Sequence, residues 1–204
     1  MLFILTGCNK TDTSRWENGV IKSEIPYNKG KIDGVAKWYY ENGQVQQLSE
    51  YRQGKLEGKT LRWYEHGKKE SEINYLQNLK NGLSSEYDRT GKITKEETFR
   101  NDTLDGLSRQ YYPNGEVKIE GNYKDGWLDG QWLYWDETGR VIGEGKFDMG
   151  SGTIRTWDMF GNLSRITEYR ENRKNGKEVI FDQQGKPVQE VIYKDDEVVE
   201  TISR

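Results

Sequence analysis

Glycine and aromatic positions recur along this chain with a fixed period. One set of glycines is spaced by 24 residues, apart from a single step of 22 residues. Its members are Gly34, Gly58, Gly82, Gly106, Gly130, Gly152 and Gly176, and a second glycine follows each of them nine residues later. An aromatic residue stands five residues after every first glycine and eight residues after every second glycine. Because glycines and aromatics keep the same phase, the chain is predicted to consist of seven structural repeats.

Each repeat has the length and the turn residues of a β-hairpin. About eight residues lie between its two glycines, and about eight more lead to its second aromatic residue, so that each run fits one strand. Asn42-Gly43 and Asn114-Gly115 stand where the two strands would join, and Asn-Gly is a strong hairpin signal because both residues tolerate positive φ. An isolated hairpin is only marginally stable, so neighbouring repeats are expected to stack. We therefore predict an all-β fold, an elongated single-layer antiparallel meander of about 14 strands.

The repeats are predicted to begin near residues 28, 52, 76, 100, 124, 148 and 170, within a repeat domain that spans residues 16–204. The sixth repeat departs from the pattern, because Met149-Gly150-Ser151-Gly152 is two residues shorter than its counterparts. Two interpretations stay open. The shortening is either a loop deletion that the fold tolerates or a local notch in the sheet that binds a partner.

Composition limits the kind of core and the kind of partner. Apolar residues make up 32% of the chain and aromatic residues 12%, which suits a thin sheet covered by rings better than a thick aliphatic core. The 31 basic and 34 acidic residues are interspersed and give a net charge of −3. A nucleic-acid partner is therefore not expected, because it would require a basic face.

Residues suited to catalysis or metal binding are scarce. The chain has one histidine, His66, and one cysteine, Cys8, so that neither a histidine-based metal cluster nor a catalytic triad is expected. His66 falls in the turn slot of its repeat, where a structural role explains it. We predict no enzyme activity, no metal and no cofactor.

A glutamate stands five residues after the second glycine in most of the repeats. The positions are Glu72, Glu96, Glu120, Glu144 and Glu190. Equivalent positions on alternate strands lie roughly 10 Å apart, which is too wide for the carboxylate pair of a retaining glycosidase. This glutamate row is interpreted either as a solvated face or as a docking stripe for a basic partner.

Several aromatic residues fall outside the fixed slots, and they concentrate in the fifth repeat. Trp127, Trp132 and Tyr134 are extra, and Trp135 occupies a regular slot beside them. Because tryptophan and tyrosine are enriched at interaction hot spots, these four residues are the candidate partner-binding residues. The competing interpretation is that Trp132 and Tyr134 pack along their own strand.

The first fifteen residues differ from the repeats. Leu5-Thr6-Gly7-Cys8 is similar to a bacterial lipobox, in which the cysteine receives a lipid. Residues 1–15 would then be the remnant of a lipoprotein signal peptide with its polar tether, and the protein would lie in the cell envelope. Only seven residues precede Cys8 and none is basic, whereas a signal peptide has a basic start and a longer apolar run. The alternative is a start without targeting meaning, and a cytoplasmic protein.

The unit from Asn101 to Val117 resembles the MORN repeat, in particular the bacterial variant found in YwqK-type proteins. The resemblance covers about residues 28–194. It implies a scaffold or protein-interaction platform and, for the bacterial variant, an antitoxin that binds a toxin protein. We therefore predict a non-catalytic binding protein with a protein partner. The alternative is a lipid-anchored envelope protein, attached through Cys8, that binds membrane lipid or glycan.

Overall fold

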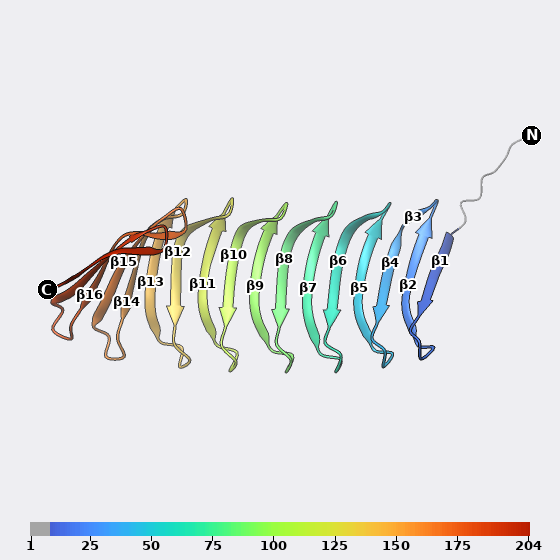
Figure 1. The fold of residues 1–204 in the computed structure, drawn as a ribbon, viewed down its shortest axis with the longest axis horizontal. Helices are drawn as coiled ribbons and strands as arrows, with labels where there is room; N and C mark the ends of the chain where they lie inside the picture. Colours follow the sequence, from blue (N-terminus) through green and yellow to red (C-terminus); the bar gives the residue numbers. More distant parts are fainter. Residues whose placement is uncertain (1–8) are drawn as a thin grey trace, which may run out of the picture. The chain divides into compact units, whose positions relative to one another are not determined.

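Eighteen β-strands and no helix make up the part of the chain that the computed structural model describes, residues 9–204 (Figure 1). The chain divides by its contacts into two compact units. The first unit runs to Thr94 and includes residues 99–102, and the second comprises residues 95–98 and 103–204. The strand β9 (Ile93–Arg100) contributes residues to both units.

Within each unit, consecutive strands pair antiparallel. The first unit contains β1 (Asn9–Arg15), β2 (Ile21–Asn28), β3 (Lys31–Ile32), β4 (Gly34–Tyr39), β5 (Val45–Arg52), β6 (Lys55–Trp63), β7 (Lys69–Leu76) and β8 (Leu79–Tyr87). The second contains β10 (Thr103–Tyr111), β11 (Val117–Lys124), β12 (Trp127–Trp135), β13 (Val141–Asp148), β14 (Ser151–Trp157), β15 (Leu163–Arg170), β16 (Arg173–Phe181), β17 (Pro187–Lys194) and β18 (Glu197–Ser203). Each of these strands bonds to its neighbour in sequence, and β2 continues its ladder onto β4. The predicted all-β antiparallel meander is confirmed.

The strands outnumber the roughly 14 that the repeats predict. β1 and β2 form a further hairpin before the first predicted repeat, β18 follows the last one, and β3 and β4 are one strand interrupted at Asp33. Residues 9–15, which we expected to be a polar tether, form β1 and pair with β2. The hydroxyls of Ser14 and Ser23 are hydrogen-bonded across this pair at 2.7 Å. This finding corrects the predicted boundary at residue 16, because residues 9–15 belong to the sheet.

The turn between the two strands of a repeat needs positive φ only at its glycine. In the turn after β4, the N–H of Gly43 donates to the carbonyl of Tyr40 at 2.9 Å. Gly43 has a φ of 85°, whereas Asn42 does not have a positive φ. The Oδ1 of Asn42 instead accepts a hydrogen bond from the N–H of Gln44 at 2.9 Å. Asparagine therefore suits this turn through its side-chain hydrogen bond, and not through positive φ as we expected.

A tighter, two-residue turn joins one repeat to the next. Gln53 and Gly54 both have positive φ, at 52° and 85°. That combination matches the twist of adjacent strands and is typical of short hairpins. Asparagine or aspartate fills the second position in several of these turns, as at Asn78, Asp102 and Asn172. The predicted starts of the repeats coincide with these turns.

In most repeats the first glycine lies inside a strand, as Gly58 does in β6, whereas Gly34 begins β4 after the interruption at Asp33. Gly58 has a φ of 116°, and the pairing of β5 with β6 shifts register beside it. A Cβ on Gly58 would lie 1.9 Å from Oε2 of Glu50, so a side chain there would require the Glu50 side chain to move. In the shortened sixth repeat, Gly152 has no positive φ and the ladder between β13 and β14 is continuous. The two-residue deletion therefore removes the bulge.

The core is a row of mostly small residues at the strand centres. In the first unit, Ala36 faces Ser49, which in turn faces Thr60, and all three are buried. The Thr60 hydroxyl donates to the Ser49 hydroxyl at 3.1 Å, so that the buried polar groups satisfy one another. In the second unit, the same row contains Trp132 between Gly121 and Gly145. The core of that unit is therefore built on an aromatic ring.

Candidate functional site

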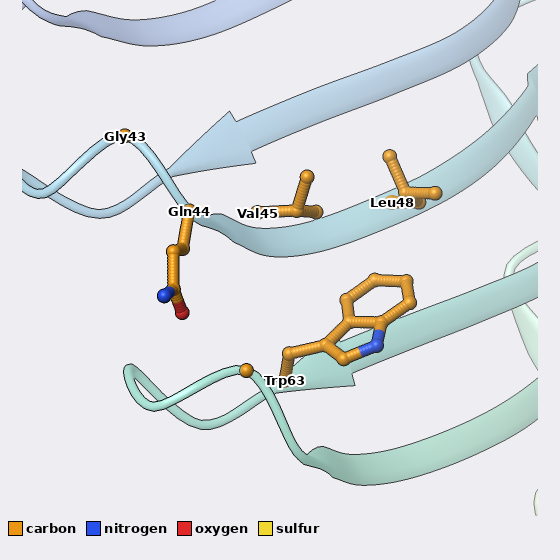
Figure 2. Close-up of a pocket in the computed structure, with 6 residues that line it drawn as sticks. Gly43, Gln44, Val45, Leu48 and Trp63 are labelled. Atoms are coloured by element: carbon orange, nitrogen blue, oxygen red, sulfur yellow. The ribbon is translucent and has the colours of Figure 1, made fainter.

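An apolar groove lies beside Trp63 in the first unit. Its volume is about 460 Å³, and it is lined by Val45 and Leu48 from β5 and by Trp63 from β6. Figure 2 shows the indole beside these two aliphatic side chains, with Gly43 and Gln44 at the end of the neighbouring turn. Tryptophan combines a large apolar surface with one donor N–H, which makes such a groove suitable for recognition.

The groove is open because its lining residues on β5, Val45 and Leu48, are short and uncharged, whereas the direct ladder partner of Trp63 is Lys69 of β7. One repeat later, the equivalent aromatic residue is Tyr87, and Lys69 stands at the position of Val45. The Nζ of Lys69 lies 5.5 Å from the centre of the Tyr87 ring, and the same ammonium pairs with Glu72 at 2.9 Å. This ion pair covers the aromatic ring. The two repeats therefore share a backbone but present different surfaces.

The second unit has a counterpart of this groove at Trp135. Its volume is about 290 Å³, and Val117, Glu120 and Trp135 line it. Glu120 stands where Leu48 stands in the first unit, and its carboxylate accepts a hydrogen bond from Nε of Arg109 at 2.6 Å. The Trp135 groove is consequently more polar than the Trp63 groove.

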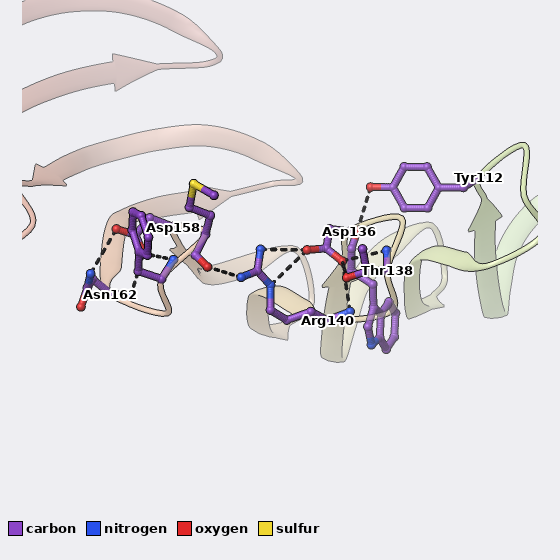
Figure 3. Close-up of polar contacts among 9 residues, drawn as sticks. Tyr112, Asp136, Thr138, Arg140, Asp158 and Asn162 are labelled. Atoms are coloured by element: carbon purple, nitrogen blue, oxygen red, sulfur yellow. Dashed lines mark hydrogen bonds and ion pairs between the residues drawn. The ribbon is translucent and has the colours of Figure 1, made fainter.

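Tyrosine hydroxyls fix the ends of the strands that carry these tryptophans. The Tyr40 hydroxyl donates to the carbonyl of Trp63 at 2.7 Å, and the Tyr112 hydroxyl donates to the carbonyl of Trp135 at 2.8 Å. Figure 3 shows the second of these bonds at Tyr112. Both bonds use the backbone of the tryptophan, so the indole ring is left free to line its groove.

Trp132, one of the predicted partner-binding residues, is buried. Its ring is 5% exposed and lies edge-on to Tyr123 and Phe147. Its Nε1–H donates to the carbonyl of Asn122 at 3.2 Å. A Cβ on Gly121 would lie 2.0 Å from the indole, which shows how closely the ring covers that glycine. Trp132 therefore packs against β11 and β13 and not along its own strand, and its ring is covered in this structure.

The other predicted partner-binding residues occupy different surroundings. Trp127 is 36% exposed and lies against Gly150, where a Cβ would approach its ring to 2.7 Å. Tyr134 is half-buried, and burial raises the pKa of its hydroxyl well above the usual range. Trp135 lines the groove described above. Of the four, Trp127, Tyr134 and Trp135 keep partly exposed side chains, and their role in partner binding stays a prediction.

The glutamate row is largely paired with neighbouring side chains. Glu72 contacts Lys59 at 2.6 Å and Lys69 at 2.9 Å, and these hydrogen bonds lower the pKa of its carboxyl group. Glu96 accepts a hydrogen bond from the Tyr111 hydroxyl at 2.6 Å. Burial, together with this bond, raises the pKa of Tyr111 to about 12. A stripe of carboxylates already held this way is a weak attractor for a basic partner, and with Glu190 buried the row as a whole is not a solvated face either.

The turn after β14 carries an exposed apolar tip that the sequence analysis missed. Met159 is 70% exposed and Phe160 is 71% exposed, while the equivalent positions of the first repeat are Glu41 and Asn42. The tip is held from below, because Oδ1 of Asp158 accepts the N–H of Phe160 at 2.8 Å and Arg140 donates to the carbonyl of Met159 (Figure 3). The sequence signal was available, since Met-Phe replaces polar residues in a turn slot.

Chemistry beyond binding finds little support in the described residues. His66 lies in its turn, where a ring nitrogen is 2.5 Å from the carbonyl of Arg89. Within residues 9–204, no group of three or more histidine, cysteine, aspartate or glutamate side chains is placed to hold a metal ion. The same residues include no helix with the length and apolar character needed to cross a membrane. Cys8, the predicted lipidation site, lies outside the described residues.

Comparison with known proteins gives a family and several similar solved structures. The model of the MORN repeat variant family matches residues 13–29, 32–53, 56–77, 80–101, 104–125 and 174–195. No curated protein matches the chain. Among solved structures, a chain of the Tc holotoxin pore of Photorhabdus luminescens is similar at 15% identity, with a TM-score of 0.26. That match covers 92% of this chain and 12% of the other, so this chain spans a small part of the holotoxin chain.

Proposed function

The chain belongs to the MORN repeat variant family, and we propose that it is a non-catalytic scaffold that binds a partner protein in the groove beside Trp63. The observation that carries the proposal is the open apolar groove of Val45, Leu48 and Trp63. Tryptophan is enriched among the few residues that dominate binding energy at protein interfaces. A partner side chain that fills the groove would bury the indole and both aliphatic side chains at once.

The groove defines the chemistry of the partner segment. It favours a large apolar side chain, because Val45, Leu48 and Trp63 line most of it. Gln44 lies at its edge and offers an amide that both donates and accepts hydrogen bonds. The partner segment should therefore present an apolar side chain to the groove, with backbone polar groups beside it that can bond to the Gln44 amide.

The experiment compares two equivalent aromatic residues. The wild-type chain, Trp63→Ala and Tyr87→Ala are used to capture partners from the source bacterium, and the affinity of the identified partner is then measured with purified proteins. Loss of a hot-spot tryptophan costs about 2 kcal/mol or more of binding energy, so Trp63→Ala should weaken binding by about thirtyfold. Tyr87→Ala is the control, because Lys69 covers that ring. Equal affinities for the two variants would contradict the proposal.

The family resemblance makes a toxin protein the first partner to test. In this version of the proposal the chain is an antitoxin, and the partner is a toxin encoded beside it. Co-expression should restore growth of cells that produce the toxin, and Trp63→Ala should lose that protection while Tyr87→Ala keeps it. Growth restored equally by Trp63→Ala would show that any neutralisation does not use this groove.

A second candidate function rests on Leu5-Thr6-Gly7-Cys8, which resembles a lipobox. Here the chain is anchored in the cell envelope by lipid on Cys8, and it binds membrane lipid or glycan. Metabolic labelling with a fatty acid in the source bacterium tests this anchor on the natural gene product. Labelling of the wild-type protein and none of Cys8→Ser is expected. Equal labelling of both proteins, or of neither, would refute the anchor.

A further inference from the structure

A second cavity lies wholly within the second unit, where strands β12 to β16 meet. Its volume is about 330 Å³, and most of its lining is apolar. Its lining includes Tyr134, Ile154, Trp157 and Tyr169. This volume lies at the lower end of the range for small-molecule sites and equals that of roughly ten water molecules.

The cavity follows from the change in side-chain size along the row at the strand centres. In β12, Trp132 fills the space above the neighbouring glycines, Gly121 and Gly145. Two strands later, in the shortened repeat, the row is continued by Ile154, which faces Gly145 on one side and Thr167 on the other. Isoleucine and threonine do not fill the space that an indole fills. A hollow therefore remains next to the aromatic core.

One wall of this cavity holds a carboxylate that is exceptional for its position. The Glu178 side chain is 4% exposed, whereas the same slot in other repeats holds Thr60, Ser84 or Ser108. Removing a carboxylate from water is costly unless partners compensate it. Replacement of a neutral hydroxyl by a buried charge therefore indicates a local electrostatic requirement.

Two cations balance this carboxylate, and one of them is only loosely engaged. Oε2 of Glu178 accepts hydrogen bonds from Nζ of Lys174 and from the Thr167 hydroxyl, both at 3.0 Å. Arg165 stands 3.6 Å from Oε1, beyond hydrogen-bond distance, and its side chain is 45% exposed. The net charge beside the cavity is positive, because two cations, Lys174 and Arg165, face one carboxylate, Glu178. The guanidinium can still offer its planar pair of donors to an incoming anion.

We propose that this cavity binds a small aromatic carboxylate, with its ring among Tyr134, Ile154 and Trp157 and its carboxylate on Arg165. The ring matches the apolar lining and the limited volume. The negative charge matches the excess positive charge at Arg165 and Lys174. This site shares no residue with the Trp63 groove. Its test is therefore independent of the partner-binding proposal.

Phenylacetate is a suitable probe, and phenylacetamide and acetate are its matched controls. Calorimetric titration of the full chain should show phenylacetate binding and an affinity for phenylacetamide at least about tenfold weaker, because the amide lacks the charge that pairs with Arg165. Acetate, which lacks the ring, should not bind measurably. No binding of phenylacetate at millimolar concentration would overturn the proposal, and so would equal binding of the acid and the amide.

Two substitutions locate the site. Arg165→Gln should remove the preference for the acid over the amide, while Arg155→Gln should keep it. Arg155 faces Glu144 and Ile166 on the neighbouring strands, whereas Arg165 shares the cavity wall. Ile154→Phe should fill the hollow and abolish binding of both aromatic probes. Unchanged binding by Arg165→Gln or by a folded Ile154→Phe variant would refute the assignment.

Discussion

The side chain of Asn172 reaches across a whole repeat to Leu128, 44 residues earlier in the chain. Its Oδ1 accepts the N–H of Leu128 at 2.8 Å, and its Nδ2 donates to the carbonyl of Gly126 at 2.8 Å. In the first unit, the equivalent Asn78 bonds only to the adjacent repeat, where Oδ1 accepts the N–H of Leu56 at 2.7 Å. The longer reach coincides with the shortened repeat between them, so the deletion brings the fifth and seventh repeats into direct contact.

Asn172→Gly should therefore destabilise the second unit more than Asn78→Gly destabilises the first. Glycine keeps the positive φ of 64° at Asn172 and of 74° at Asn78, so each substitution removes mainly the side-chain bonds. Two bonds are lost at Asn172 and one at Asn78, a difference of about 1 kcal/mol. Hydrogen exchange of the Leu128 and Leu56 amides measures the local effect. Equal losses of unfolding free energy in the two variants, measured by urea denaturation, would contradict the bridging role.

Gly121 and Trp132 should behave as a coupled pair. Gly121→Ser places a side chain where the indole lies, since even a Cβ would come within 2.0 Å of it, and overpacking of this kind costs about 1–3 kcal/mol. The double variant Gly121→Ser/Trp132→Thr recreates the Ser49–Thr60 pair of the first unit. Urea denaturation should show that the double variant is more stable than the sum of the single effects allows. Simple additivity would mean that the two sites are independent.

The sequence pattern predicts the hairpins and their order because glycines and aromatics mark every turn and strand end. It does not predict which rings are exposed, because exposure depends on residues from neighbouring strands. The Trp132 ring fills the space that Gly121 and Gly145 leave on the neighbouring strands. The register that brings these residues together is visible only in the folded sheet. The Trp63 groove depends in the same way on Val45 and Leu48 in the preceding strand.

The first glycine of each repeat shows a second limit of prediction from the sequence. The 24-residue period identifies Gly58 as special, but it does not show that Gly58 lies in a bulge, because the register shift involves the neighbouring strand β5. The Met159–Phe160 tip, by contrast, could have been found from the sequence. Met159 and Phe160 replace the polar residues that the aligned turn position of the first repeat carries, Glu41 and Asn42.

The Met159–Phe160 tip should contribute to partner contacts and little to stability. Met159→Glu combined with Phe160→Asn restores the residue types of the first repeat, Glu41 and Asn42. Both wild-type side chains are exposed, so the free energy of unfolding should change by no more than about 0.5 kcal/mol. Capture of the partner identified with the wild-type chain should weaken. A fall in stability with unchanged capture would instead make the tip a packing element.

Asp136 should make the stability of the second unit depend on pH in the acid range. A hydrogen bond from the Thr138 hydroxyl, helped by the N–H groups of Thr138 and Arg140, lowers the pKa of its carboxyl from 3.8 to about 2. Because the folded state holds the ionised form, this contribution is complete above the unfolded value of 3.8 and is lost as the pH falls toward 2. Asparagine at this position keeps an acceptor oxygen but does not titrate.

Asp136→Asn should consequently flatten the dependence of the melting temperature on pH between about 4 and 2, because the variant lacks the full contribution at neutral pH and approaches the wild type as the pH falls toward 2. Glu137→Gln is the matched control, since it removes the same charge from the next position of the turn. Melting curves recorded by circular dichroism over this range provide the measurement. If Asp136→Asn and the wild type lose stability in parallel as the pH falls, the hydrogen bonds from Thr138 and Arg140 do not favour the ionised carboxylate, and another group controls the acid transition.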